Sequence, residues 1–253
     1  MGLWSKEHAM TLLPAVAVML VIGVILRRTI GKKNIETRML PLRIIAVALV
    51  VLEIGKQLNS AIHGYDLYVL PFHFCSLALF MLPVMAFYKG KHTDTVRSIG
   101  TVVCAAITLL MMIYPCLIYG SWNITGYFKG YVDFHTVTFH NLVVFAFILI
   151  LALDLHIPKG KGDTKPLVLF TLGFCVVSSF MALLLETNFA NYYRCNIPVF
   201  EQLRISMQSV LGVWGAQLVY ISIVSLLNVL FVLLSYWVYR LARQLINRKT
   251  VTV

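Results

Sequence analysis

The chain has 253 residues, of which 60% are hydrophobic and 12% are charged, and its formal net charge is +11. A soluble domain carries roughly 25% charged residues, so this composition excludes an ordinary soluble globular protein. Apolar runs of about 20 residues, the length at which a helix crosses the hydrocarbon core of a bilayer, recur along the sequence. The sequence therefore predicts an all-α, polytopic membrane helical bundle that forms a single domain over residues 1–253.

Seven transmembrane helices are expected. In chain order their ranges are 10–26, 40–58, 70–87, 98–119, 134–155, 166–185 and 210–238. The last range is long enough for one tilted helix, or for a short interfacial helix from about residue 201 that leads into a span. The first has the length of a signal-peptide core, but it lacks a small-residue cleavage site and ends in Arg27-Arg28, so we interpret it as a true span.

The positive charges orient this bundle. Most of the 21 Lys and Arg residues lie after the first, third and fifth spans and in the C-terminal tail. Because short loops rich in Lys and Arg stay cytoplasmic, we expect an outside N-terminus and a cytoplasmic C-terminus, in a multi-pass protein of the plasma membrane. The positive net charge then comes from basic residues that lie near anionic lipid at the cytoplasmic face, and it does not indicate a nucleic-acid site.

Polar residues collect near the predicted outer ends of five spans, whereas the inner halves hold few such groups beyond Arg43. The collected residues include Glu53, Lys56, Gln57, Asn59, His73, Cys75, Tyr114, His135, His140, Asn141, Thr187, Asn188, Asn191 and Tyr192. Ionisable groups inside a bilayer are costly, and each is a candidate for function. We therefore expect one polar cavity in the outer half, bordered by Glu53, His73, His140 and Asn188.

Helical spacing groups some of these residues. Glu53, Lys56 and Gln57 share a helix face, and pairing Glu53 with Lys56 would lower the cost of burying both charges. The same spacing predicts a shared face for Asn188, Asn191 and Tyr192. Alternatively, Glu53 and Lys56 form a purely structural pair that holds the helices together.

The histidines and the cysteine need a separate spacing argument. Thr136 and His140 share a face of the fifth span, whereas His135 points roughly 140° away from His140. His73 and Cys75 are two positions apart and cannot face one point on a regular helix. An irregular helix start after the nearby proline could relax that constraint. Alternatively, His73 and His135 are interfacial, hydrated groups, and Cys75 is a small core residue.

The remaining histidines and cysteines suggest no site. His8, His63, His92 and His156 lie at span ends or in loops, where we expect them to be solvated. Three cysteines are interpreted as packing residues and a fourth as an outer-loop residue without an evident partner; these are Cys104, Cys116 and Cys175, then Cys195. Asn123-Ile124-Thr125 forms a weak glycosylation sequon.

Three short segments carry a resemblance to a known family. They are Leu70-Pro71-Phe72-His73-Phe74-Cys75-Ser76, then Phe134-His135 through Phe139-His140, then Thr187-Asn188 with Asn191-Tyr192. Over about residues 40 to 235 the chain resembles the YwaF-like family of bacterial integral membrane proteins. That family has animal relatives that look like acyltransferases moving fatty acyl chains between phospholipids, including ether lipids. The resemblance implies that Cys75 is the acyl-accepting nucleophile and that His73 and His140 assist it.

The chemistry fits the residue types. A histidine can take the thiol proton, and the thiolate can then attack a lipid ester, while His140 or Asn188 stabilises the oxyanion. The leading interpretation is a membrane-bound acyltransferase that acts on a membrane lipid substrate near the outer leaflet. Its expected substrate-binding residues are Glu53, Lys56, His135, Asn188, Asn191 and Tyr192.

No nucleotide-binding loop and no HExxH motif occurs, so we expect no soluble cofactor and no metal. Zinc on His73, Cys75 and His140 is a minor alternative based on ligand type. A small-solute binding or transport protein, and a scaffold with a structural polar network, remain the competing functions. Transporters often show internal repeats, and none is seen in this sequence.

Overall fold

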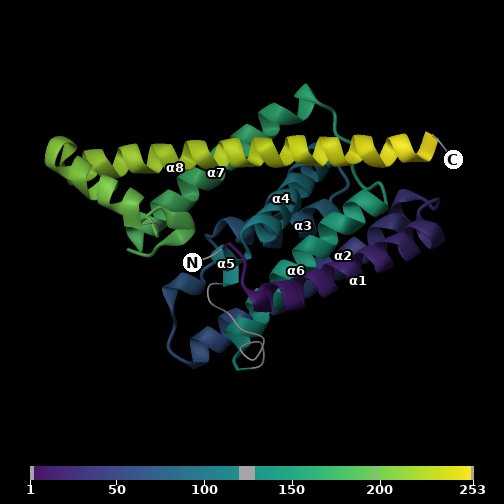
Figure 1. The fold of residues 1–253 in the computed structure, drawn as a ribbon, viewed down its shortest axis with the longest axis horizontal. Coiled ribbons are helices and arrows are strands. Elements are labelled where there is room, and N and C mark those ends of the chain that lie inside the picture. The colour runs from purple at the N-terminus through teal and green to yellow at the C-terminus, as the bar shows by residue number, and fades with distance from the viewer. Residues whose placement is uncertain (1–2, 120–128, 197, 252–253) are drawn as a thin grey trace.

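The computed structural model describes residues 3–119, 129–196 and 198–251, and these residues form helices and connecting loops without a strand (Figure 1). The α-helices are α1 Lys6–Ile30, α2 Ile35–Ile62, α3 Leu77–Phe87, α4 Thr93–Ile113, α5 Pro115–Tyr119, α6 Tyr131–Ala152, α7 Lys161–Leu184 and α8 Pro198–Val251. Short 3-10 turns are η1 Leu67–Val69, η2 Phe74–Ser76 and η4 Phe189–Asn191. The all-α prediction is confirmed for this part of the chain.

Five of the described helices are long and apolar enough to cross a membrane, namely α1, α4, α6, α7 and α8. The prediction of seven spans is therefore confirmed only for these five, and the chain is a multi-pass membrane protein. The other two expected spans correspond to α2, which carries Arg43, Glu53 and Lys56, and to the shorter apolar segment Phe74–Phe87. At about 1.5 Å per residue that segment reaches ~21 Å, less than the ~30 Å of a hydrocarbon core.

The third expected span begins later than predicted. Its α-helix starts at Leu77, and not near residue 70. Leu70 is extended, with a ψ of 144°, because the ring of Pro71 disfavours helical geometry in the residue before it. His73 is also extended and precedes η2, which contains Cys75. The angular constraint of a regular helix therefore does not apply to His73 and Cys75.

Two further boundaries differ for local reasons. α4 ends at Ile113 because Pro115 forces Tyr114 out of the helical region, at φ −142° and ψ 67°. Gly212, at φ 70° and ψ 168°, interrupts α8, and the helix changes direction there (Figure 1). Of the two alternatives for the last span, the structure therefore has a short helix that leads into a long one.

α6 lies at the centre of the bundle and packs against α1, α2 and α4, while α3 packs between α2 and α4, and α7 packs against α8. Fully buried leucines and isoleucines of several helices fill the main core, including Leu49, Leu82, Ile107 and Leu149. Cys104 is buried in this core, and Cys175 is buried in a smaller cluster between α7 and α8. Their predicted packing role is confirmed.

Arginines from three helices meet at the C-terminal end of α6. The Nη1 atoms of Arg27, Arg38 and Arg243 donate to backbone carbonyls of residues 151–153 over 2.8–3.1 Å. The Asp154 carboxylate contacts Arg27 at 3.5 Å and also accepts a hydrogen bond from Arg243. The helix dipole stabilises cations at a helix C-terminus. The three arginines therefore join the ends of α1, α2 and α8 to the end of α6, and this end of the bundle is called the arginine end.

The other basic loops lie at the same end. Glu36 at the start of α2 contacts Arg43 at 2.6 Å and Lys89, which follows α3, at 3.0 Å. Lys159, between α6 and α7, pairs at 2.5 Å with Asp94 at the start of α4. The loops predicted to share one side of the membrane are thus gathered at one end of the bundle. That this end is cytoplasmic stays a prediction.

Candidate functional site

Glu53 organises the polar cluster at the opposite end of the bundle. The residue is 8% exposed, and its Oε1 accepts a hydrogen bond from Gln57 at 2.7 Å and lies 2.9 Å from Lys56 Nζ. Its Oε2 lies 3.2 Å from His135 Nε2 of α6. The shared face predicted for α2 is confirmed. His135, which could have been a hydrated boundary residue, is instead buried beside this carboxylate.

The cluster is tied to the α2–α3 loop and to the start of α6. Gln57 Nε2 donates to the Val69 carbonyl at 3.0 Å, and Tyr65 donates from its hydroxyl to Gln57 Oε1. Tyr131 Oη donates to the Leu52 carbonyl at 3.1 Å. Because these bonds come from the α2–α3 loop and from α6, they fix the C-terminal end of α2 relative to the segment that carries His73.

His73 is oriented by a backbone carbonyl. Its Nε2 lies 2.9 Å from the Tyr68 oxygen, and since a carbonyl only accepts, Nε2 is the protonated nitrogen. The ring packs against the rings of Tyr68 and Phe189, with centroid distances of 4.5 and 5.4 Å. In the neutral tautomer the Nδ1 atom of His73 is therefore left as a proton acceptor.

His140 has the same kind of orientation from a different helix. It is 5% exposed, and its Nδ1 donates to the Thr136 carbonyl at 2.7 Å. Its Nε2 is buried and has no hydrogen-bond partner among the described residues. The ring faces Tyr119, at a centroid distance of 6.0 Å. A buried polar atom without a partner is rare and marks a place where a ligand or water can bind.

Cys75 is half-buried and carries a free thiol. No hydrogen bond joins its sulfur to a histidine ring within the described part of the chain. However, Cys75 packs against the main core, which includes Phe139 next to His140, and Gln57, next to Lys56, donates to the Val69 carbonyl in the loop before His73. Segments from α2, η2 and α6 therefore lie in one region, where the side-chain contacts seen among the described residues join Glu53 to Lys56, Gln57 and His135.

The predicted helical face of Asn188, Asn191 and Tyr192 is wrong. α7 ends at Leu184, and Glu186, Ala190 and Asn191 all have positive φ angles between 47° and 63°. Left-handed residues stop a helix, so the spacing of three and four residues does not align these side chains. All three have hydrogen-bond partners outside the polar cluster.

Tyr192 is fully buried, and its hydroxyl lies 3.2 Å from both Ser225 and Asn228 of α8. Asn188 accepts from the Arg194 backbone at 3.1 Å and donates to Asn196 at 3.2 Å, and so closes its own loop. Tyr192 therefore anchors α8 and does not line the polar cluster.

The Asn191 carbonyl accepts a hydrogen bond from Tyr220 of α8. Phe189 is the residue of this loop that reaches the site, because its ring packs against both Phe72 and His73. Ser178 of α7 also donates to the Phe72 carbonyl at 2.8 Å. The loop thus supports His73 through an aromatic contact that the polar pattern of the sequence did not indicate.

A thiol–imidazole contact between Cys116 and His8 lies at the same end of the bundle. His8 was expected to be solvated, but it is fully buried, and its Nδ1 lies 3.4 Å from the Cys116 sulfur. The reason is local: Ser5 and His8 form a capping box at the start of α1, and Trp4 donates to the Met112 carbonyl at 3.2 Å, which holds α1 against the end of α4. The Ser-x-x-His spacing is a usable signal for the helix start, but the burial of His8 comes from contacts with α5 and with the end of α4.

His156 is 5% exposed and stacks on Tyr239 near the arginine end, so the expectation of a solvated side chain is wrong there as well. His63 and His92 are exposed as expected. Cys195 is a free, half-buried thiol. The Asn123 sequon lies outside the described residues.

No group of three His, Cys, Asp or Glu side chains that could hold a metal ion occurs in the part of the chain that the structure describes. The zinc alternative on His73, Cys75 and His140 therefore has no support from their placement.

Taken together, the apolar helices, the basic end and the polar end define a multi-pass helical membrane protein. The sequence pattern of the TMEM164 family matches residues 3–236, and the chain belongs to this family. This finding corrects the resemblance to the YwaF-like family, which rested on three short segments and is not supported by the match. No curated protein and no solved structure matches the chain.

Proposed function

We propose that this protein is a membrane-embedded acyltransferase that moves a fatty acyl chain between phospholipids or lipid-like substrates through the Cys75 thiol. The observation that carries the proposal is the surroundings of that thiol. His73 and His140 each bond a backbone carbonyl with one ring nitrogen and keep the other as a proton acceptor. Lys56, which lies 2.9 Å from Glu53, is the cation of the neighbouring cluster and can stabilise negative charge that develops during the transfer.

The transfer takes place in two steps, first from the donor lipid to the thiol and then from the thiol to the acceptor lipid. The Cys75 proton passes to His73 Nδ1 or His140 Nε2, and the sulfur attacks the ester carbonyl of the donor lipid. A sulfur–carbon bond forms, the carbon–oxygen bond breaks, and the leaving lysolipid alkoxide takes the proton from the histidine. The hydroxyl of an acceptor lysolipid then reverses these steps, which releases the thiol. Lys56 supplies positive charge near the developing oxyanion.

The direct sulfur–imidazole contact has to form when substrate enters, because it is not present in this structure. Catalytic hydrogen bonds are often long without substrate and tighten in the complex. η2 is a single 3-10 turn after an extended segment, and a small rotation there redirects the thiol more easily than in a regular helix. The proposed setting is the outer leaflet of the plasma membrane, with the N-terminus outside.

The test is acyl exchange between labelled phospholipid and a lysolipid in proteoliposomes. We expect Cys75→Ala and Cys75→Ser to fall to about a hundredth of wild-type exchange or less, as when a catalytic nucleophile is lost. Mass spectrometry should find an acyl thioester on Cys75 in the wild type. Cys195→Ala is the matched control, since this half-buried thiol lies in a loop bonded to Glu201, and it should retain exchange.

A further arm of the test uses Cys116→Ala, because Cys116 is the thiol for which the described residues provide a direct histidine contact. If Cys116→Ala abolishes exchange while Cys75→Ala retains it, the nucleophile is assigned wrongly.

The second candidate is binding or transport of a small solute. It is favoured by the contact of Glu53 with Lys56 and His135, which gives a buried site with both charge signs. Absence of exchange by the wild type with every lipid tried would make this candidate the leading one. Binding of a zwitterionic solute that is lost in Glu53→Gln would then be the supporting result.

A further inference from the structure

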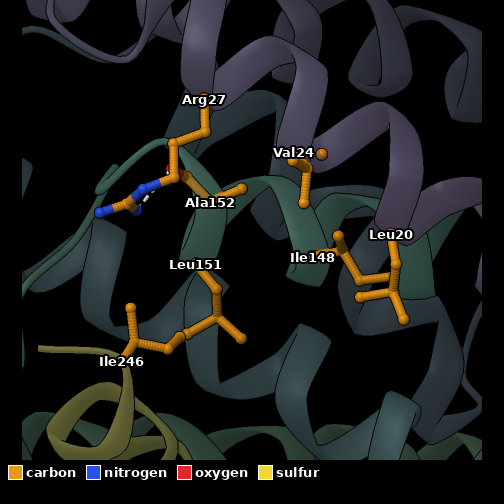
Figure 2. A pocket seen from close by; sticks show the side chains of 8 residues that line it. Leu20, Val24, Arg27, Ile148, Leu151, Ala152 and Ile246 are labelled. Atoms are coloured by element: carbon orange, nitrogen blue, oxygen red, sulfur yellow. Dashed lines mark hydrogen bonds between the residues drawn. The ribbon is translucent and has the colours of Figure 1, made fainter. Parts of the chain in front are cut away.

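A groove of about 350 Å³ lies between α1, α6 and α8, at the arginine end of the bundle and away from the polar cluster (Figure 2). Its walls are apolar, and Arg27 closes one end. The apolar side chains are Leu20, Val24, Ile148, Leu151 and Ile246. This volume is within the range of roughly 300–1,000 Å³ that small-molecule sites occupy. Leu20 and Val24 are about half exposed, so the groove opens toward the surface of α1.

The groove follows from how the three helices meet. Gly23 lets α1 approach α6 closely, since a Cβ atom at this position would lie 3.0 Å from Ile148 Cγ2. α8 packs against α4 and α7, and Ile246 in its C-terminal part reaches the groove from the far side. α1 and α8 therefore stand on either side of α6 with a space between them.

The arginine end of the groove has more positive than negative charge. Arg27 and Arg243 share the single carboxylate of Asp154, which leaves the group of three with one net positive charge. The Arg243 Nε atom is buried and has no hydrogen-bond partner among the described residues, and its residue is one helical turn from Ile246. Arg27 is 36% exposed and makes its contacts through Nη1, as Figure 2 shows for Ala152.

We propose that this groove is a binding site for one anionic glycerophospholipid. An acyl chain fills the apolar part, and the phosphate accepts hydrogen bonds from Arg27, which lines the groove. Guanidinium groups bind phosphate in a bidentate geometry, and basic pockets between transmembrane helices bind anionic headgroups. The net positive charge selects an anionic lipid over a zwitterionic one. The site is separate from the polar cluster and does not depend on the acyltransferase proposal.

The test measures lipid retention by the detergent-purified full chain in native mass spectrometry, with phosphatidylserine and phosphatidylcholine of identical acyl chains. We expect phosphatidylserine to bind more tightly and Arg27→Gln to weaken it about fivefold, the effect of one basic residue near an anionic group. Val24→Trp should fill the groove and remove binding of both lipids. Val21→Trp is the matched control, because Val21 is 59% exposed on the same helix outside the groove.

Three results would overturn the proposal. They are equal retention of the two lipids by the wild type, loss of binding in Val21→Trp as large as in Val24→Trp, and a dimer in which a second copy of the chain covers the groove. Val24→Trp keeps the test decisive if Arg27→Gln fails to fold, since it changes no polar contact.

Discussion

Glu53 shows how one carboxylate can hold a polar cluster together at one end of an apolar helix bundle. Its two oxygens contact Gln57, Lys56 and His135, and the side chains of Glu53 and Lys56 are only 11% and 12% exposed. Neither charge would be tolerated alone in such surroundings. The cluster is therefore stable only as a group, because removing one member leaves the remaining charge buried without its partner.

We predict that Glu53→Gln lowers the free energy of unfolding by about 3 kcal/mol, since it leaves the Lys56 ammonium buried without its carboxylate. Combining it with Lys56→Met should recover much of this loss, because the unpaired charge is then gone. Thermal and denaturant unfolding in detergent micelles would measure both changes.

The control for this prediction is Glu36→Gln. Glu36 also contacts two cations, but its side chain is 50% exposed, and a surface pair contributes about 1 kcal/mol or less. Equal losses for Glu53→Gln and Glu36→Gln would contradict the view that burial makes the Glu53 cluster costly to break.

At the scale of elements, interruptions of helices position the site. Pro71 delays α3, which frees His73 and Cys75 from helical spacing, and Pro115 ends α4, which brings Cys116 toward His8. Gly212 divides α8 in a backbone conformation that is essentially restricted to glycine. The Pro and Gly residues that cause these interruptions can be recognised in the sequence. Which residues they bring into contact depends on the neighbouring helices.

Gly212→Ala should destabilise the protein by about 1–3 kcal/mol, through backbone strain alone. Apart from the adjoining residues of the chain, no atom lies within 4 Å of a Cβ placed at Gly212, so a clash with another part of the protein does not contribute. The same substitution at Gly173 in α7 also meets no atom within 4 Å, but the backbone there is helical. Gly173→Ala should therefore stabilise the protein by about 1 kcal/mol. Unfolding experiments that rank the two variants in the opposite order would refute this account of the interruption.

At the scale of the whole molecule, charge is divided between two ends. Arg27, Arg38 and Arg243 surround the end of α6, and the pairs of Glu36 and Asp94 with Lys89 and Lys159 lie at the same end. The Glu53 cluster lies at the other end. Because the positive-inside rule acts on loops, this division predicts that the arginine end faces the cytoplasm.

Labelling of single introduced cysteines would test this topology, in a chain whose five native cysteines are replaced by serine. Cysteines at Lys32 and Lys161 should react with a membrane-impermeant maleimide only after the membrane is permeabilised. A cysteine at Tyr65, which is 45% exposed in the α2–α3 loop, should react in intact cells. If Lys32 and Lys161 react from outside, or if the two differ from each other, the predicted orientation is wrong.

The sequence by itself determined the class of protein, the five long apolar helices, the face shared by Glu53 and Lys56, and the gathering of basic loops at one end. These features depend on composition and on local periodicity, which act within one helix or one loop. The packing role of Cys104 and Cys175 followed from residue type in the same way.

Only the tertiary structure decided which neighbours these residues have. His135 contacts Glu53, His8 is buried against Cys116, and Tyr192 is held by α8. Each of these contacts connects residues that are between 33 and 108 positions apart in the chain, so local spacing does not predict them. Left-handed residues after α7 removed a helical face that spacing alone predicted. The groove at Arg27 depends on the meeting of three helices, and no periodicity within one of them encodes it.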